Sequence, residues 1–365
     1  MKFPSMDFGF SFLLAISMAI QPIVAAPAAR LAALERRANW DWPNVERLFV
    51  FGASYATTGF RSGPDGLPDP AHPWGNSLAM TPEHGPTNAN GPNFVMYLTD
   101  TFNASQLLTY DFAFPGAQVS GAATGGNAGN DLVTQVQQTF YHGYTPAGAR
   151  EAGHPTRTEW HGDSSLFLFF FGINDNQAVF EKPNYAALTD RDFQAYKEQL
   201  ESLYTYGARN FLLMNNPPMD TMPDFTGKGG VGTRVSATHR QNIKRSVDNF
   251  NAHMSSMVVD FRTRHPDIAI AVFDTHALFT QMQSSLAAMN ALTTQYGSHR
   301  IEHLTDACPA YTTVNDGSLG DVNFFAESCG APVSAYFWFN RLHPTWSVHK
   351  VMAGKIAEFL WGWSP

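Results

Sequence analysis

The chain has 365 residues, of which 44% are hydrophobic and 15% are charged, so it holds enough apolar material for one large hydrophobic core. Its formal net charge is −8, and no cluster of Lys and Arg is long enough to follow a phosphate backbone. We therefore expect no nucleic-acid partner. We expect residues 38–365 to form a single domain and the protein to be a monomer.

The first residues have the layout of a secretory signal peptide. Lys2 precedes an apolar stretch over residues 8–20, and a run of small residues ends at Ala28. A membrane anchor is the alternative, but Gln21-Pro22 ends the apolar stretch before the ~20 residues needed to span a bilayer. We expect cleavage after Ala28, secretion and no stable membrane insertion. The dibasic pair at 36–37 is a candidate second cleavage site, which would make residues 29–37 a short propeptide.

Two further features fit an exported protein. Cys308 and Cys329 are the only cysteines, and in an oxidising compartment a disulfide is favoured over two buried thiols. Closing a loop of about twenty residues would contribute ~3 kcal/mol on chain-entropy grounds. One sequon, Asn103-Ala104-Ser105, lies in a polar stretch, and we expect Asn103 to be glycosylated.

Short apolar runs alternate with amphipathic segments along the rest of the chain. The apolar runs predict buried strands at 47–52, 108–114, 166–171, 210–214 and 268–273. The amphipathic segments predict helices at 131–141, 190–206, 237–264, 276–289 and 347–361. This alternation predicts an α/β fold with a mostly parallel five-stranded sheet covered on both faces, and a site beyond the carboxyl ends of the strands.

Three of the predicted strands end in groups able to bind an oxyanion. Ser54 follows the first strand, where its hydroxyl can be exposed and its own N–H free, although for a lone serine a helix N-cap is the commoner role. Gly116 follows the second strand, and Asn174 follows the third. A hydroxyl, a backbone N–H and an amide would therefore meet along one edge of the sheet, where they can hold a tetrahedral oxyanion.

The C-terminal run Phe339-Asn340-Arg341-Leu342-His343-Pro344-Thr345 supplies a candidate base. His343 stands three residues after an amide and just before a proline, so a loop can present its imidazole while Asn340 orients the ring. Together with Ser54, this run predicts acyl chemistry. For His343 alone, the alternative is a loop imidazole satisfied by the backbone.

These four blocks occur in order between residues 49 and 343 and resemble the GDSL-type members of the SGNH hydrolase superfamily. The similarity is in particular to secreted fungal members, which include carbohydrate esterase family 16 acetylesterases and proteins called GDSL lipases. The resemblance implies a three-layer α/β/α sandwich of flavodoxin-like order and no cofactor. It implies that Ser54 is the nucleophile and His343 the general base, with the Ser54 N–H, the Gly116 N–H and the Asn174 side chain as the oxyanion hole.

Two positions depart from the family pattern. Ala53 stands where the Gly-Asp-Ser motif has its Asp, which removes a carboxylate but no catalytic atom. Asn340 stands where the family usually has the Asp of its Asp-x-x-His block. An amide cannot stabilise an imidazolium as a carboxylate does, so we expect a weaker catalyst than an Asp-bearing relative. Asp175 and Asn176 are expected to brace the loop after the third strand.

The resulting expectation is a secreted serine esterase acting on short acyl esters, chiefly acetyl esters of carbohydrates. The alternatives are a lipase or lysophospholipase-type hydrolase, and a weakly active or non-catalytic carbohydrate-binding relative that lost its Asp at Asn340. The segment His299-Arg300-Ile301-Glu302-His303 also has the spacing of a zinc-peptidase helix. Its helix would be short and no third ligand is evident, so no metal is expected.

Overall fold

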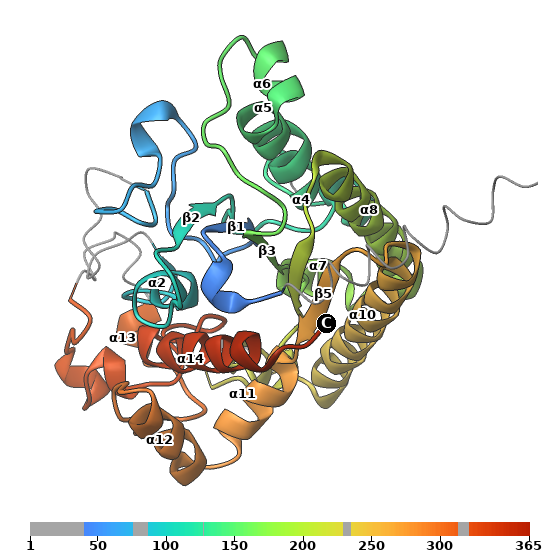
Figure 1. Ribbon diagram of the computed structural model, residues 1–365. Helices are drawn as coiled ribbons and strands as arrows, with labels where there is room; N and C mark the ends of the chain where they lie inside the picture. Colours follow the sequence, from blue (N-terminus) through green and yellow to red (C-terminus); the bar gives the residue numbers. More distant parts are fainter. Residues whose placement is uncertain (1–39, 76–86, 127, 229–234, 313–320) are drawn as a thin grey trace, which may run out of the picture.

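Five parallel strands form the centre of the computed structural model (Figure 1), which describes residues 40–75, 87–126, 128–228, 235–312 and 321–365. Their order across the sheet is β2-β1-β3-β4-β5, and every neighbouring pair is parallel. This confirms the predicted α/β fold and brings the carboxyl ends of β2, β1 and β3 side by side. The strands are β1 (Arg47–Gly52), β2 (Leu108–Asp111), β3 (Ser165–Phe170), β4 (Asn210–Met214) and β5 (Ala269–Phe273).

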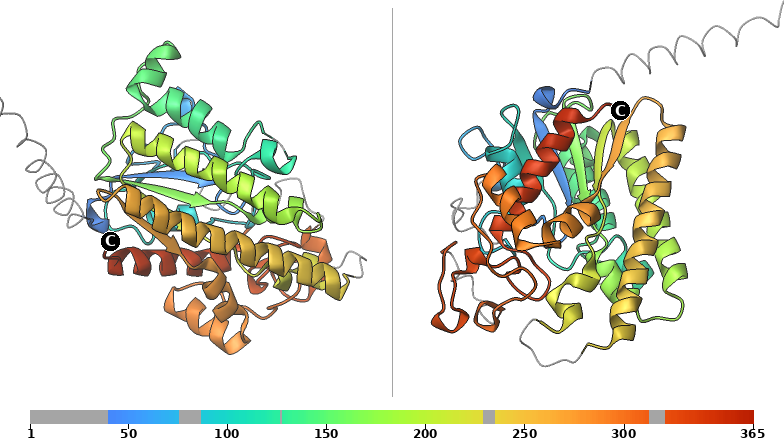
Figure 2. Two further views of the ribbon diagram at one scale, coloured as in Figure 1. Left: turned by 90° about the vertical axis from the view of Figure 1, so that its right-hand side faces the viewer. Right: turned by 90° about the horizontal axis from the view of Figure 1, so that it is seen from below.

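Both faces of the sheet are buried. Phe49 and Phe51 of β1 pack on one face, and Leu48 and Val50 pack on the other, because side chains alternate along a strand. The face of Phe49 is covered by α8 (Tyr185–Tyr206) and α10 (Ala237–Arg264). The opposite face is covered by α2 (Phe94–Asp100), α11 (Thr275–Gln283), α12 (Leu286–Gln295) and α14 (Trp346–Gly362). Figure 2 shows the sheet between these two helical layers, as the three-layer prediction requires.

The predicted boundaries hold for β1, β4 and α10 and differ elsewhere. β2 ends at Asp111 rather than at 114, although the N–H groups of Phe112 and Phe114 still donate to β1 carbonyls. The single helix predicted over 276–289 is two helices, because the Ser285 side chain accepts the Ala288 N–H at 3.1 Å and starts α12 anew.

The segment predicted as one helix over 131–141 is also divided. It consists of α4 (Leu132–Thr134), the π-helical turn η3 (Gln135–Phe140) and α5 (Tyr141–Tyr144). The remaining short elements are η1 (Trp42–Asn44), η2 (Pro64–Gly66), α3 (Gly121–Thr124), α6 (Pro146–Glu151), α7 (Ile173–Val179), η4 (Met219–Thr221), α9 (Pro223–Thr226), α13 (Pro309–Thr312), η5 (Glu327–Cys329) and η6 (Val333–Ala335).

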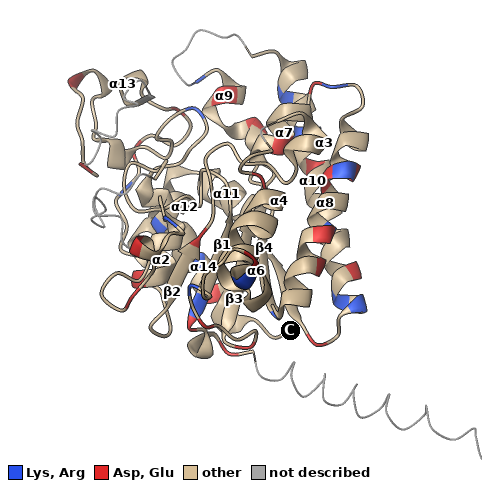
Figure 3. Ribbon diagram, turned by 90° about the horizontal axis from the view of Figure 1, so that it is seen from above, with Lys and Arg blue, Asp and Glu red and all other residues tan. Residues whose placement is uncertain are grey.

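Charged residues occur along both α8 and α10 (Figure 3). They include ion pairs such as Lys244 with Asp248 at 2.7 Å. Within the described ranges no helix is long and apolar enough to cross a bilayer. The predicted signal peptide and propeptide, over 1–28 and up to 37, lie outside the described residues.

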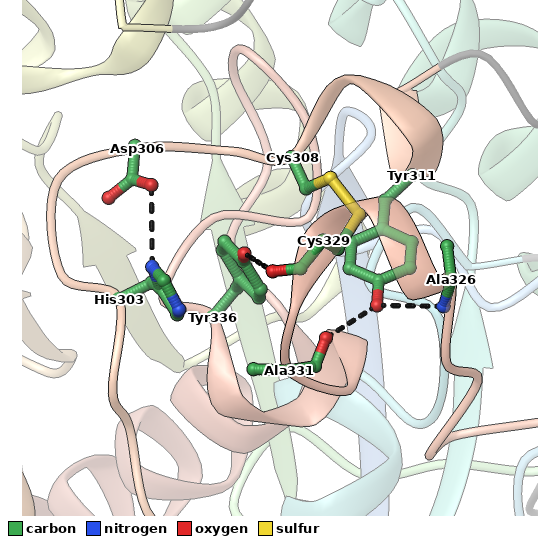
Figure 4. Close-up of a disulfide and its surroundings, with 8 residues drawn as sticks. All are labelled: His303, Asp306, Cys308, Tyr311, Ala326, Cys329, Ala331 and Tyr336. Atoms are coloured by element: carbon green, nitrogen blue, oxygen red, sulfur yellow. Dashed lines mark hydrogen bonds and ion pairs between the residues drawn. A yellow bond between two sulfur atoms is a disulfide. The ribbon is translucent and has the colours of Figure 1, made fainter.

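The predicted cysteine pair is present. Cys308 and Cys329 are bonded, with their Cα atoms 5.7 Å apart (Figure 4). The Tyr336 hydroxyl donates to the Cys329 carbonyl at 2.6 Å, and the Tyr311 hydroxyl donates to the Ala331 carbonyl at 2.6 Å. The disulfide therefore belongs to a small buried cluster ahead of the C-terminal loop. Asn103 is exposed, and its glycosylation stays a prediction.

Candidate active site

Ser54 lies in the turn that follows β1, at the edge where three strands end. Its side chain is buried and its Oγ is 2.7 Å from His343 Nε2, 289 positions along the chain. The Asn88 amide donates to the Ser54 carbonyl at 3.3 Å. The structure thus brings together two residues that lie near opposite ends of the chain.

Gln135 braces the strand end beneath Ser54. Its amide accepts the Gly52 N–H at 3.0 Å and donates to the Gly52 carbonyl at 2.9 Å. Gly52 has no side chain, and a Cβ there would lie 3.2 Å from both Ala56 Cβ and the Phe170 carbonyl. Gln135 was not predicted as a site residue, because a glutamine in an amphipathic segment carries no signal of a contact 83 residues away.

Asn340 orients His343 through its carbonyl oxygen. Asn340 Oδ1 is 3.0 Å from His343 Nδ1, and it also accepts the N–H groups of Leu342 and His343, both at 2.9 Å. Two backbone donors on one atom identify that atom as the oxygen, because an amide nitrogen cannot accept them. His343 therefore carries its proton on Nδ1 and presents the Nε2 lone pair to Ser54.

The environment of His343 disfavours its charged form. Burial lowers the pKa of His343 to about 4, and Asn340 adds no negative charge to oppose this effect. The imidazole is therefore neutral at pH 7 and can accept a proton from Ser54. The imidazolium that would form is stabilised by an amide dipole only.

Tyr55 contacts the loop that carries His343, and His349 packs against Tyr55. The Tyr55 hydroxyl donates to the Leu342 carbonyl, and its ring centre lies 5.5 Å from that of His343. His349 is buried between Tyr55 and Phe94 and accepts the Phe94 N–H at 3.3 Å, and burial lowers the pKa of His349 to about 3. His349 is therefore a neutral core residue. Neither contact was predicted from the sequence.

Gly116 lies in a tight turn after β2. The Ala117 N–H donates to the Phe114 carbonyl at 3.0 Å, with Pro115 and Gly116 at the two central positions. Gly116 has a φ of 80°, the value that a type II turn needs at its second central position, whereas a Cβ at this residue would meet nothing within 4 Å. Backbone conformation rather than space therefore requires glycine here.

Asn174 is the second residue of α7, which follows β3, and it is bonded to the Gly116 turn. Its Nδ2 donates to the Ala117 carbonyl at 2.8 Å, and the Asn174 carbonyl accepts the Gln118 amide at 3.2 Å. Among the described residues, no hydrogen-bond acceptor is found for the N–H group of Ser54 or for that of Gly116. These two N–H groups are therefore free to bind substrate oxygen at the same strand ends.

The bracing role expected of Asp175 agrees with the structure, whereas the zinc-peptidase spacing at 299–303 does not form the helix that such a site needs. Asp175 is buried and accepts the Val119 N–H at 2.7 Å, as expected of a bracing residue. Residues 299–303 form no helix, so the imidazoles of His299 and His303 do not lie one helical turn apart. His303 instead stacks on Tyr336, with ring centres 4.0 Å apart, and lies 3.4 Å from Asp306 (Figure 4).

Comparisons with known proteins identify the family of the chain. Residues 48–356 match the family described as GDSL-like Lipase/Acylhydrolase. An acetylesterase of Thermothelomyces thermophilus is 27% identical over 318 residues, covering 86% of this chain and 88% of that protein. The thermolabile hemolysin of Vibrio parahaemolyticus is 23% identical over 311 residues, covering 78% of this chain and 66% of that protein. A solved alpha/beta hydrolase from the metagenome of Lake Arreo, Spain, aligns with a TM-score of 0.39 and 14% identity over 88% of this chain and 100% of that chain.

Proposed function

Because the chain belongs to the GDSL-like lipase/acylhydrolase family and is a carboxylic ester hydrolase, we propose that it is a secreted serine esterase that removes short acyl groups, chiefly acetyl, from carbohydrates. The observation that carries the proposal is the hydrogen-bonded series from Ser54 Oγ through His343 to Asn340 Oδ1. A nucleophile, a base and a group that orients the base are the parts that acyl transfer requires.

In the first half of the reaction, Ser54 Oγ attacks the acyl carbonyl carbon and its proton passes to His343 Nε2. The carbonyl oxygen becomes an oxyanion that the Ser54 N–H, the Gly116 N–H and Asn174 Nδ2 bind. The C–O bond to the alcohol then breaks, and the alcohol leaves with the proton from His343. The product of this half is an acyl group esterified to Ser54.

The second half regenerates the enzyme. A water molecule gives a proton to His343 Nε2 as its oxygen attacks the acyl carbon, and the same donors hold the second oxyanion. The bond to Ser54 Oγ breaks, and Oγ regains its proton from His343. The carboxylic acid leaves, so one ester and one water give one alcohol and one acid.

Asn340 limits this chemistry less than the same replacement limits a serine protease. In a serine protease with a Ser-His-Asp triad, replacing the triad Asp by Asn lowers kcat by ~10⁴, because the Asn holds the wrong imidazole tautomer. Here Asn340 Oδ1 is fixed by two backbone N–H groups and holds the productive tautomer. The remaining deficit is the missing negative charge beside the imidazolium.

Three observations support the details of substrate and location. One relative that matches over most of both chains is named an acetylesterase. Phe114 is 46% exposed beside Gly116, where an apolar ring can contact a small acyl group or a sugar face. The Cys308–Cys329 bond fits an oxidising compartment.

The test is the rate of p-nitrophenyl acetate hydrolysis by the purified protein and by Ser54→Ala. Ser255→Ala, on the exposed surface of α10, is the matched control. We expect Ser54→Ala to reduce the rate to background and Ser255→Ala to leave it unchanged. Acetyl, butyryl and octanoyl esters, followed by acetylated xylan, then give the acyl length and the alcohol.

The neutral residue at Asn340 favours one second candidate, a carbohydrate-binding protein without turnover. Equal rates for the wild type and Ser54→Ala would support that candidate and contradict the esterase proposal. Binding of acetylated xylan without release of acetate would then be the expected behaviour. A lipase-type activity would instead appear as a preference for the octanoyl ester.

A further inference from the structure

Three successive backbone N–H groups in the loop that carries Gly116 each donate to a different buried carboxyl group. The Val119 N–H donates to Asp175 Oδ1 at 2.7 Å, the Ser120 N–H to Asp192 Oδ1 at 3.1 Å, and the Gly121 N–H to Asp131 Oδ2 at 3.0 Å. Each of the three Asp residues is at most 2% exposed. They come from α7, from α8 and from the residue before α4.

Two of these carboxyl groups contact each other. Asp175 and Asp192 accept the N–H groups of adjacent residues, Val119 and Ser120, and both side chains are buried. This places the two carboxyl groups side by side, close enough for one to donate to the other when it is protonated. Asp175 Oδ2 is buried and accepts no N–H or hydroxyl among the described residues, which leaves Asp192 as its partner. Ionisation of both members of a buried, adjacent carboxyl pair is strongly disfavoured, and a hydrogen bond between them needs one proton.

This contact joins the two segments that carry the proposed oxyanion donors: α7, which carries Asn174, and the loop that carries Gly116. We call these two segments the arms of the oxyanion hole. Asp175 directly follows Asn174 on α7, while Asp192 holds Ser120 in the Gly116 loop. The loop and α7 are further joined by Asn174 Nδ2 to the Ala117 carbonyl. A change in the separation of Asp175 and Asp192 would therefore move Asn174 relative to Gly116.

We propose that Asp175 and Asp192 are positioning residues that share one proton at neutral pH and thereby hold the Gly116 N–H and Asn174 Nδ2 at the separation that the oxyanion requires. The proposal rests on the oxyanion hole of the proposed function. When the proton is lost, two adjacent carboxylates repel each other and the two arms separate. Esterase activity then falls at alkaline pH although His343 remains neutral.

The surroundings of the pair favour retention of the proton. Burial and the neighbouring Asp175 raise the pKa of Asp192 to about 10, and burial also raises the pKa of Asp175. The other ionisable groups facing the pair are Asp131, whose charge also raises the pKa of Asp192, and Tyr196 of α8. None of these groups brings a positive charge that would stabilise a second carboxylate.

The sign of the pH dependence follows from linkage. The folded protein retains a proton on the Asp175–Asp192 pair that the unfolded chain loses above pH ~4, because burial and the neighbouring carboxyl group raise the pKa of the pair. The stability that this proton contributes is complete below pH ~4 and is lost as the pH rises through the raised pKa. An amide at position 192 would keep the donor at every pH.

The experiment compares Asp192→Asn, Asp192→Ala and the double variant Asp175→Asn/Asp192→Asn with the wild type. In Asp192→Asn the amide oxygen can accept the Ser120 N–H while Nδ2 donates to Asp175 Oδ2. In the double variant each amide oxygen is engaged by the loop, so two NH₂ groups face each other and the contact is lost. Asp190→Asn, on the exposed side of the same helix, is the matched control.

We measure kcat and KM for p-nitrophenyl acetate from pH 6 to 10.5, with the rate of Ser54→Ala subtracted. We expect Asp192→Asn to keep kcat within about threefold at pH 7 and to lose the alkaline decline seen in the wild type. We expect Asp192→Ala and the double variant to lose about 10²-fold in kcat with little change in KM, as misplaced catalytic groups do. Asp190→Asn should match the wild type at every pH.

Several outcomes would overturn the proposal. One is a folded Asp192→Ala with wild-type kcat, and another is an alkaline decline in Asp192→Asn identical to that of the wild type. If Asp192→Ala does not fold, the pH profile of Asp192→Asn decides. A Ser54→Ala protein as active as the wild type would instead contradict the proposed function itself, so the two failures are distinguishable.

Discussion

The loop that carries Gly116 is held by buried carboxyl groups, whereas the imidazole of His343 is held by a neutral amide. We call these the oxyanion side and the base side of the site. On the oxyanion side, three buried carboxyl groups bind successive N–H groups of the loop that carries Gly116. On the base side, the imidazole of His343 contacts Ser54 Oγ and the neutral amide of Asn340. Among the described residues, buried carboxyl groups therefore hold the loop that carries Gly116, and none of them hydrogen bonds to His343.

This difference shows what the fold can supply without charge. The base side still has the right tautomer, because Asn340 Oδ1 is held by the N–H groups of Leu342 and His343. Orientation and charge, which one Asp supplies together in most triads, are separated in this protein. We therefore expect changes on the oxyanion side to lower turnover strongly, and a charge added on the base side to raise it.

The largest effect should come from Asn174→Ala. The change removes the proposed oxyanion donor and also the bond from Nδ2 to the Ala117 carbonyl. Loss of one such donor costs ~10²–10³ in kcat in a known hydrolase, so we expect a fall of at least that size with KM little changed. Steady-state kinetics with p-nitrophenyl acetate measure it.

Gln177→Ala, one turn further along α7, is the matched control and should leave kcat unchanged. A fall of less than tenfold in Asn174→Ala would mean that Asn174 only joins the loop to α7. The oxyanion would then be held by the Ser54 and Gly116 N–H groups alone.

A smaller effect of opposite sign should come from Asn340→Asp. A carboxylate beside Nδ1 stabilises the imidazolium and raises the pKa of His343 from about 4. A stabilisation worth one pKa unit corresponds to about tenfold, so we expect about a tenfold rise in kcat at pH 8. The acid limb of kcat/KM should move upward from near pH 4, because a base with a higher pKa is protonated sooner as pH falls.

The variant should therefore exceed the wild type about tenfold at pH 8 and about fivefold at pH 5, and should lose this advantage only below about pH 4, where both imidazoles are protonated. Asn242→Asp on α10 adds the same charge away from the site and should shift neither limb. An unchanged or lower rate for Asn340→Asp at pH 8, with an unmoved acid limb, would contradict the view that charge is what the base side lacks.

The strands of the sheet and the residues that follow them could be predicted from the sequence, because they depend on short apolar runs along the chain. Continuous apolar runs such as β1 and β4 have the length of buried strands, and their predicted bounds match the structure. Ser54, Gly116 and Asn174 were each located by the strand that they follow. The parallel arrangement then brings them to one edge.

The residues that hold those groups in place could not be predicted in the same way. Gln135 reaches Gly52 across 83 positions, and Asp192 reaches Ser120 across 72. Each of these polar residues lies in a segment whose pattern predicts only a helix. Their partners depend on how the helices pack on the sheet, which periodicity does not specify. The break between α11 and α12 was missed for a different reason, since Ser285 acts as a cap inside a continuous helical pattern.

The smallest effect on turnover should come from the Cys308→Ser/Cys329→Ser double variant. The disulfide closes a loop with a sequence separation of 21, and its loss should lower the free energy of unfolding by ~3 kcal/mol. The turn that presents His343 has its own main-chain bonds, from the Phe339 N–H to the His343 carbonyl and from the Thr345 N–H to the Phe337 carbonyl, both at 2.9 Å. We therefore expect kcat to stay within twofold of the wild type, roughly the scatter of an uncoupled change.

Urea unfolding measures the stability, and p-nitrophenyl acetate kinetics below the unfolding transition measure kcat. Tyr336→Phe is the control, because it removes only the hydrogen bond to the Cys329 carbonyl and should cost about 1 kcal/mol. A double variant that stays folded but loses tenfold or more in kcat would show that the covalent bond positions His343. The base side would then depend on a cross-link for the orientation that Asn340 and the main chain otherwise provide.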